Sequence, residues 1–305
     1  SSPPGHMPSP RWLQLDQGSF VALTTPFSDG VVDEKAFQSF VDWQVKQGTD
    51  GLVPCGTTGE SPTLTHAEHK HVTELCIEVT AGRVPVMAGA GSNSTAEAVE
   101  LAKHAERAGA NSVLVVTPYY NKPTQAGLYA HFKAINDAVG IPVFIYNIPG
   151  RSVVDMTLET FQRLAELPNI DGVKDATADL GRPLVYRKAL GPDFCQMSGE
   201  DATAIPYLAA GGHGCISVTA NIAPALCAEQ HAAWNAGNVA RAMEIQQMLI
   251  PVHQSMFCES SPGPVKYAAK LMGLSSAEMR LPMVEIADSS KIAVESAIRT
   301  LGLID

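Results

Sequence analysis

The sequence lacks the patterns that mark several classes of protein. Its net charge is −10 and 17% of its 305 residues are charged, without a run of Lys or Arg, which disfavours nucleic acids and anionic membranes as partners. No apolar stretch approaches the ~18 residues of a membrane span. None of the six cysteines forms a C-x-x-C pair or a Cys/His cluster with zinc-finger spacing. We therefore expect reduced thiols and a cytoplasmic protein.

Motifs for phosphate and metal binding are also missing. No G-x-G-x-x-G follows the first apolar run, and the stretch "GAGSNS" (89–94) has no Walker lysine. The histidines at positions 66, 69 and 71 do not form the H-E-x-x-H pattern of a helix-borne metal site. These absences disfavour a doubly wound nucleotide-binding sheet, the runner-up fold, and we expect neither a metal nor a cofactor.

Short apolar runs recur along the chain, and they are nearly continuous in apolar character rather than alternating. Strands of a parallel sheet that is buried on both faces have this pattern. The eight runs are 20–27, 51–56, 84–90, 112–118, 141–147, 170–174, 194–199 and 214–219. Helical patterns lie between them, and the one over 64–82 begins with a capping box of Thr65 and Glu68. The other clear helical patterns are 33–48, 94–109, 125–140 and 155–169.

Strands that alternate with helices in this number predict an α/β fold of the (β/α)8 barrel type. From about residue 225 the strands stop and four helical stretches follow. We expect the barrel over 11–225 and a C-terminal helical domain over 226–305. The Pro-rich segment 1–10 has no apolar segment of a signal peptide, and we interpret it as a remnant of expression outside the fold.

Catalytic groups of such barrels lie at the carboxyl ends of the strands. The run 170–174 ends on Lys174, and the neighbouring strand ends supply threonines, tyrosines and an arginine. A free lysine ammonium has a pKa of about 10.4, so only about 0.04% is neutral at pH 7. Desolvation in a barrel mouth favours the neutral amine, which can attack a ketone to form an imine. Hydroxyl groups can move the protons and Arg151 can bind a carboxylate, so the set predicts an aldol reaction of small keto acids.

Each of these residues also has a structural interpretation. Lys174 alone is typical of a strand-end lysine that reaches water. Tyr119 and Tyr120 could be an aromatic pair that caps the core, and Arg151 could be a surface charge. The pair Lys266 and Lys270, spaced i, i+4 on an amphipathic helix, is expected at a solvated edge.

Six stretches together resemble the dihydrodipicolinate synthase (4-hydroxy-tetrahydrodipicolinate synthase) family. They are "GTTGES", "VTPYYNKPTQAGLYAHFKAI", "YNIPGR", "GVKDAT", "GGHGCISVTAN" and "PVK", in this order. The resemblance extends from about residue 18 to 303. The resemblance implies a (β/α)8 barrel with a C-terminal helical domain, usually a homotetramer made as a dimer of dimers. It implies a lyase that joins pyruvate to L-aspartate-4-semialdehyde in diaminopimelate and lysine biosynthesis.

The resemblance also assigns roles to residues. It implies that Lys174 forms the Schiff base and that Tyr146, Thr57 and Tyr120 relay protons, with Tyr120 reaching into the neighbouring subunit's site. The implied substrate contacts are Thr58, Arg151, Gly199 and Ile216. Inhibition by lysine is implied at an effector pocket formed by Ser61, His66, His69, Asn93, Glu97 and Tyr119.

Two kinds of alternative remain open. Sister Schiff-base aldolases, such as N-acetylneuraminate lyase or keto-deoxy sugar acid aldolases, share the barrel and the lysine. The "GTTGE" stretch and Arg151 in "YNIPGR" favour the synthase over these. A catalytically silent paralogue that serves as a binding scaffold is the other alternative, and the intact set of Lys, Tyr and Thr argues against it.

Overall fold

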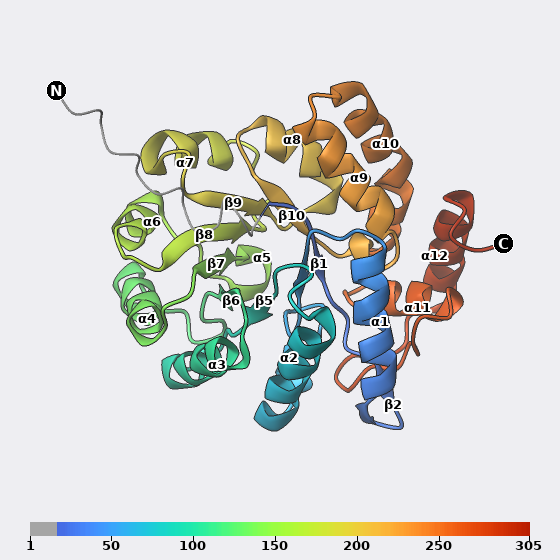
Figure 1. Ribbon diagram of the computed structural model, residues 1–305, viewed down its shortest axis with the longest axis horizontal. Coiled ribbons are helices and arrows are strands. Elements are labelled where there is room, and N and C mark those ends of the chain that lie inside the picture. The colour runs from blue at the N-terminus through green and yellow to red at the C-terminus, as the bar shows by residue number, and fades with distance from the viewer. Residues whose placement is uncertain (1–16) are drawn as a thin grey trace.

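The computed structural model describes residues 17–305, and the segment 1–10 interpreted as a remnant lies outside the described residues. Eight parallel strands form the centre of the molecule, with helices around them (Figure 1). The strands are β1 (Gly18–Ala22), β4 (Gly51–Val53), β5 (Met87–Gly89), β6 (Ser112–Val116), β7 (Val143–Asn147), β8 (Ile170–Asp175), β9 (Cys195–Ser198) and β10 (Gly214–Ser217).

The strand order is β4-β1-β10-β9-β8-β7-β6-β5, and a parallel bridge between Leu52 and Val86 joins the two ends of the sheet. The sheet is therefore a nearly closed barrel, which confirms the predicted fold class. Each of the eight predicted runs overlaps a strand of the barrel. The first is shorter than expected, because the chain leaves the barrel at Ala22 and turns into a small antiparallel hairpin, β2 (Phe27–Ser28) with β3 (Val31–Val32).

Helices follow the strands as the periodicity predicts. The first four are α1 (Glu34–Lys46), α2 (His66–Thr80), α3 (Thr95–Ala108) and α4 (Gln125–Ala138). The next four are α5 (Pro149–Ser152), α6 (Leu158–Ala165), α7 (Arg182–Leu190) and α8 (Ala204–Ala209). The predicted capping box is present, since Thr65 and Glu68 each accept the other's backbone N–H. Three of these helices were not predicted from the sequence: the short α5 near the "YNIPGR" stretch, α7 and α8.

The barrel has an inner and an outer core because successive side chains of a strand point to opposite faces. On β7, Phe144 and Tyr146 belong to the cluster inside the barrel, whereas Val143 and Ile145 pack outward against the helices. A strand that is apolar at every position therefore contributes side chains to the inner core and to the outer core. Tyr146 lies near the carboxyl end of its strand, so the inner core ends at a mouth that holds polar groups.

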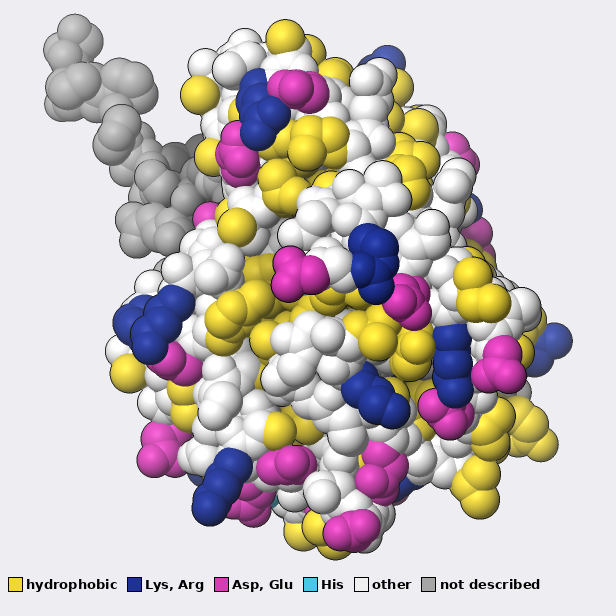
Figure 2. Space-filling model, turned by 90° about the vertical axis from the view of Figure 1, so that its right-hand side faces the viewer, with side chains coloured by type: hydrophobic (Ala, Val, Ile, Leu, Met, Phe, Trp, Pro, Cys, Tyr) yellow, Lys and Arg dark blue, Asp and Glu magenta, His cyan; other side chains and the backbone are white. Residues whose placement is uncertain are grey.

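Four further helices follow the last strand. They are α9 (Pro224–Asn235), α10 (Val239–Ser255), α11 (Gly263–Leu271) and α12 (Asp288–Thr300). Helices α11 and α12 lie on the side of the barrel that carries α1 (Figure 1), and Val265, Ala268 and Val294 form part of a separate apolar cluster there. Acidic and basic side chains are interspersed over this face of the molecule (Figure 2).

Candidate active site

Lys174 points into the barrel from the carboxyl end of β8. In the parallel register it pairs with Tyr146 on one side and Met197 on the other. Register partners in adjacent strands point to the same face, and both partners belong to the inner core. Lys174 is 7% exposed, and its Nζ lies 4.1 Å from the centroid of the Tyr146 ring. The interpretation of Lys174 as a strand-end lysine that reaches water is therefore wrong.

The surroundings of Lys174 leave its amine without a carboxylate. Within residues 17–305 no Asp or Glu lies at ion-pair distance from its Nζ. Gly199 faces the lysine stem: a Cβ at this position would lie 3.1 Å from Lys174 Cε and 2.9 Å from Ala176 Cβ. The glycine thus leaves room for the lysine. Ile216, which is buried on β10, belongs to the same inner cluster as Tyr146.

Thr57 and Thr58 lie on the loop between β4 and α2. Thr58 is buried and Thr57 is half-buried. The loop is fixed by its own backbone, since the Glu60 N–H donates to the Thr57 carbonyl at 3.0 Å. It is also fixed from the segment between β1 and β2, because Thr25 Oγ1 donates to the Gly59 carbonyl at 2.7 Å. Two hydroxyl groups are therefore held on a rigid turn at the carboxyl end of a barrel strand.

Tyr119 and Tyr120 do not cap the core, so that interpretation is wrong. Tyr119 is 37% exposed and Tyr120 is 90% exposed. Tyr120 has a φ of 72°, a left-handed conformation that is uncommon for a residue with a Cβ and turns its side chain outward. The Asn93 side chain donates to the Tyr119 carbonyl, and Asn121 donates to the Asn93 carbonyl, at 3.2 and 2.9 Å. The loop that presents Tyr120 is thus pinned to the start of α3.

Arg151 is exposed on α5, directly after the strand that carries Tyr146. Its Nη2 lies 3.5 Å from the carbonyl oxygen of Ser261, which belongs to the chain just before α11. The helical turn ends at Val153, whose φ of 69° and ψ of −37° are strained for a β-branched residue. Arg151 therefore lies at the surface on a short segment between β7 and the C-terminal helices, and its guanidinium contacts the chain before α11.

The six residues of the predicted effector pocket fall into smaller groups. His66 Nε2 lies 3.9 Å from Glu97 Oε1, and Asn93 is bonded to the Tyr119 carbonyl. Ser94 precedes α3 and makes no side-chain capping bond. The Glu97 carboxylate in the first turn of α3 accepts a hydrogen bond from Ser92 Oγ at 2.7 Å. His69 is buried, its Nε2 donates to the Gly89 carbonyl, and burial lowers its pKa. Ser61 lies apart from these contacts on a 3-10 turn before α2.

Sequence reasoning missed two polar networks near the mouth, one half-buried and one buried. Behind the end of β7, Asn147 donates to Asp155 at 2.9 Å, and Arg182 binds the same carboxylate with two nitrogens. This ion pair lowers the pKa of Asp155. Asp201 accepts the backbone N–H groups of Val218 and Thr219 and so fixes the chain after β10. Polar residues that follow buried strands were the available signal for both networks.

Lys266 contradicts its predicted place at a solvated edge. Its side chain is fully buried, and Nζ donates to Glu60 Oε2 at 2.6 Å. Lys270, one turn later on α11, is exposed as predicted. Helical spacing groups the two lysines, but only the packing of α11 against the barrel distinguishes them. The partner Glu60 belongs to the "GTTGE" loop, 206 residues earlier in the chain.

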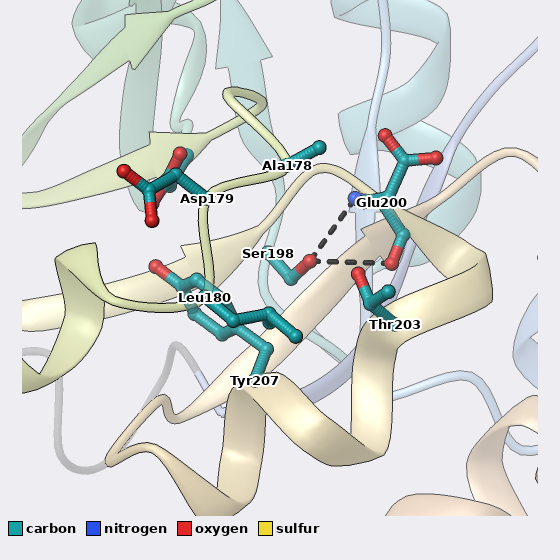
Figure 3. Close-up of a pocket in the computed structure, with 8 residues that line it drawn as sticks. Ala178, Asp179, Leu180, Ser198, Glu200, Thr203 and Tyr207 are labelled. Atoms are coloured by element: carbon teal, nitrogen blue, oxygen red, sulfur yellow. Dashed lines mark hydrogen bonds between the residues drawn. The ribbon is translucent and has the colours of Figure 1, made fainter.

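A small cavity with several polar lining residues lies at the ends of β8 and β9 (Figure 3). Asp175, Ser198, Glu200 and Tyr207 are among its lining residues, and its volume of about 10 Å³ is enough for roughly one water molecule. Burial raises the pKa of Asp175 and of Glu200. The Asp175 Oδ2 atom and the Tyr207 hydroxyl have no hydrogen-bond partner among the described residues. Because a keto acid does not fit this space, the barrel mouth remains the candidate active site.

Between residues 17 and 305 no group of three or more His, Cys, Asp or Glu side chains is arranged to hold a metal ion. No helix in that range combines the length and the apolar character needed to cross a membrane.

Comparison with known proteins gives relatives over nearly the whole chain. A protein named 4-hydroxy-tetrahydrodipicolinate synthase from Bradyrhizobium diazoefficiens is 61% identical over 289 residues, which cover 95% of this chain and 98% of the relative. One of the same name from Methylobacterium radiotolerans is 62% identical, with 94% and 96% covered.

Solved structures of similar proteins share the fold. Dihydrodipicolinate synthase from Aquifex aeolicus superposes with a TM-score of 0.93 at 43% identity, over 94% of this chain and 98% of that one. The enzyme from Acinetobacter baumannii, solved in complex with pyruvate, gives 0.92 at 45% identity, with 94% and 99% covered. The enzyme from Cyanidioschyzon merolae, solved with lysine bound, gives 0.91 at 37% identity, with 94% and 99% covered.

A family model agrees with these relatives. The model of the Dihydrodipicolinate synthetase family matches residues 16–301, which include every strand of the barrel and all four C-terminal helices. The chain therefore belongs to the dihydrodipicolinate synthetase family.

Proposed function

We propose that the barrel mouth condenses pyruvate with L-aspartate-4-semialdehyde, as the names of the relatives indicate, and that Lys174 is the nucleophile of this lyase. The observation that carries the proposal is the position of Lys174. Its amine is buried at a strand end, over the Tyr146 ring and beside Gly199, and no carboxylate within residues 17–305 pairs with it. A buried lysine without a carboxylate partner is placed to attack a carbonyl carbon.

The reaction follows from this geometry. The Lys174 nitrogen attacks the C2 carbonyl carbon of pyruvate, and loss of water from the carbinolamine gives an imine. Removal of a proton from C3 converts the imine to an enamine, whose C3 forms a bond to the aldehyde carbon of the second substrate. The resulting alkoxide takes a proton. The amino group of the joined product then displaces Lys174 from the imine carbon, which closes the ring and frees the lysine.

Each transfer of a proton in this sequence needs a hydroxyl group close to the imine. We assign the relay to Tyr146, Thr57 and the Tyr120 of a neighbouring subunit. Thr58 donates to the pyruvate carboxylate, and Arg151 offers a two-pronged guanidinium to the carboxylate of the semialdehyde. Gly199 and Ile216 line the space around the imine on the opposite side of the mouth.

A homotetramer and a cytoplasmic location belong to the same proposal. Tyr120 is 90% exposed in the single chain, which supports a role in a neighbour's site rather than in its own. Five of the six free cysteines are buried, and free thiols suit a reducing compartment. Mixing inactive Tyr120→Phe chains with inactive Lys174→Ala chains should restore part of the activity. Absence of recovery in verified mixed oligomers would argue against a shared site.

The decisive experiment combines trapping with a coupled assay. Borohydride reduction with pyruvate should add one pyruvate to Lys174, as read from intact and peptide masses. Consumption of pyruvate should then depend on L-aspartate-4-semialdehyde and not occur with N-acetylmannosamine. A protein that is not labelled would be a silent scaffold. A labelled protein that prefers the sugar would be a sister aldolase.

Inhibition by lysine is a second part of the proposal. The supporting observations are the Glu97 carboxylate near His66 and the bond from Asn93 to the Tyr119 carbonyl, at the base of the loop that presents Tyr120. The carboxylate of Glu97 can bind an ammonium group of lysine, and Asn93 and Tyr119 can bind its α-groups. Ser61, His66 and His69 complete the proposed pocket.

The pocket is tested by titrating lysine against the initial rate. Wild type should be inhibited, while Glu97→Ala should lose the inhibition and keep its uninhibited rate. A coupling of about 1–3 kcal/mol is typical for such effectors. A wild type that is indifferent to millimolar lysine would refute the effector site and leave the catalytic assignment intact.

A further inference from the structure

The buried ammonium of Lys266 lies between three parts of the chain. It comes from α11 in the C-terminal helices, donates to Glu60 Oε2 at 2.6 Å and donates to the Thr25 carbonyl at 2.9 Å. The ring of Phe27 lies under it, with 4.4 Å between Nζ and the ring centroid. Burial of an ammonium is costly unless it is paired and hydrogen-bonded, and here both conditions are met.

Glu60 transmits this contact to the loop of Thr57 and Thr58. Its backbone is in the left-handed region, with φ 57° and ψ 38°, which few residues other than glycine adopt without support. Both carboxylate oxygens are engaged, because Oε1 accepts the Arg280 backbone N–H at 3.3 Å while Oε2 accepts from Lys266. The Glu60 N–H in turn donates to the Thr57 carbonyl. The side-chain ion pair therefore holds a strained residue that closes the turn.

The second contact of Lys266 reaches the same loop through Thr25, which follows β1. Thr25, whose carbonyl accepts from Lys266, donates through Oγ1 to the carbonyl of Gly59. Gly59 is closely packed, since a Cβ there would lie 3.1 Å from the Leu23 carbonyl oxygen and 3.2 Å from the Cys55 nitrogen. The turn is thus fixed by Lys266 at two successive residues, directly after Thr58.

Arg280 covers this network on the side of α2. Its guanidinium binds the carboxylate of Glu68 and lies 4.6 Å from the centroid of the Phe27 ring, and it donates to the carbonyls of Thr63 and Gly30. The contact with Arg280 lowers the pKa of Glu68 to about 2. Residues beyond the barrel thus form a continuous polar contact with the loop that bears the two hydroxyls.

We infer that Lys266 is a positioning residue for the condensation: through Glu60 and Thr25 it holds the hydroxyls of Thr57 and Thr58 against the imine, and so makes catalysis depend on the C-terminal helices. The inference rests on the proposed function, which gives these two threonines their roles. Lys266 itself touches neither substrate nor the reacting amine. Its loss should affect the steps that use the threonines and spare the site of the semialdehyde.

The test uses the double variant Lys266→Met/Glu60→Gln, which removes both charges while keeping side chains of similar size. Without the ion pair the turn loses its anchor, and a displacement of about 1 Å can cost on the order of 100-fold in rate. We expect kcat to fall by about 10- to 100-fold, measured well below Tm, and the KM for pyruvate to rise. The KM for the semialdehyde should not change, and borohydride should still trap pyruvate on Lys174.

Two control variants separate positioning from stability. Lys270→Met changes the exposed lysine one turn later on the same helix and should leave all constants at wild-type values. Val294→Ala creates a cavity in the apolar cluster of α12 and should lower Tm without changing kcat at low temperature. A double variant with wild-type kcat and wild-type KM for pyruvate would overturn the inference. Equal changes in both KM values would do so as well.

Measurements on the wild type distinguish a failure of the proposed function from a failure of this inference. If wild type forms no adduct with pyruvate or does not use the semialdehyde, the proposed function fails whatever the variants do. If wild type performs both and the double variant matches it, only the role of Lys266 fails.

Discussion

Two lysines are buried among the described residues, and their surroundings differ in a way that separates two roles. The two side-chain nitrogens are alike in that each lies over an aromatic ring. Lys174 Nζ is 4.1 Å from the centroid of the Tyr146 ring, and Lys266 Nζ is 4.4 Å from that of Phe27. Lys266 also has the Glu60 carboxylate and the Thr25 carbonyl as acceptors. Lys174 lacks a carboxylate partner within residues 17–305.

Whether a buried lysine is paired with a carboxylate decides whether its nitrogen can react. An ammonium that is bonded to a carboxylate is held in its charged form, so its nitrogen has no free lone pair for attack. Burial lowers the pKa of Lys266, and the charge of Glu60 opposes this change. The Lys174 amine lies over the Tyr146 ring and has no carboxylate partner within residues 17–305, so it is available to attack a carbonyl. We therefore assign structure to Lys266 and chemistry to Lys174.

The largest expected effect is the loss of the nucleophile. Lys174→Ala should abolish both condensation and the borohydride-trapped pyruvate adduct, because no other buried amine faces the mouth. Peptide mass spectrometry of the wild type should find the adduct on Lys174 and none on Lys266. A full-yield adduct on Lys266 would reverse the comparison.

The ring under Lys174 should matter through its hydroxyl. Tyr146→Phe keeps the aromatic face below the amine but removes the proton relay, and general acid–base groups typically contribute about 10²–10⁴ in rate. We expect kcat to fall within that range, with Tm unchanged. Turnover close to that of wild type would remove Tyr146 from the relay and leave it only a packing role, like that of Phe27 under Lys266.

The two lysines should respond in opposite ways when each is replaced by methionine. Lys266→Met leaves the Glu60 carboxylate buried without its cation, and breaking a buried pair typically costs about 3–5 kcal/mol. Lys174→Met leaves no such charge and should keep or raise the free energy of unfolding, as is common for substitutions in active sites. Urea unfolding of both variants gives the measurement. Equal losses of stability would remove the distinction between them.

Arg151 offers a test confined to the second substrate. Arg151→Ala should raise the KM for L-aspartate-4-semialdehyde by about 10-fold or more, since a charge-assisted hydrogen bond is worth about 1.5–3 kcal/mol. The pyruvate adduct on Lys174 should form as in wild type. This is the converse of the pattern expected for the Lys266→Met/Glu60→Gln variant. Unaltered kinetics with the semialdehyde would show that another group binds its carboxylate.

The smallest expected effect concerns the backbone that carries Arg151. Val153 has a φ of 69° and is 63% exposed, so Val153→Gly removes the strain of a β-branched residue without opening a cavity. The free energy of unfolding should rise by about 0.5–1 kcal/mol after the greater entropy of glycine in the unfolded chain is counted. Val31→Gly, at a similarly exposed valine in β3, should lower it instead. A loss of stability in Val153→Gly would mean that the conformation is not strained.

Much of the fold and of the mouth is determined locally by the sequence. An apolar run that is buried on both faces has to be a strand of a parallel sheet, and eight such runs with helices between them close into a barrel. The carboxyl end of each run then lies at one mouth, so connectivity places Lys174 and Tyr146 side by side and the loop of the two threonines at the same end of the barrel. Thr65 with Glu68 also specifies the start of α2 within four residues.

Only the tertiary structure decides which lysine of α11 is buried. Lys266 and Lys270 have the same spacing and the same chemistry, and helical periodicity does not choose between them. The choice depends on a carboxylate 206 residues away, on a turn whose conformation is itself held by that contact. The exposure of Tyr120 and the strain at Val153 likewise come from how loops meet. Local patterns specify elements because backbone hydrogen bonding and side-chain period act over a few residues, whereas ion pairs between distant loops exist only after the chain has packed.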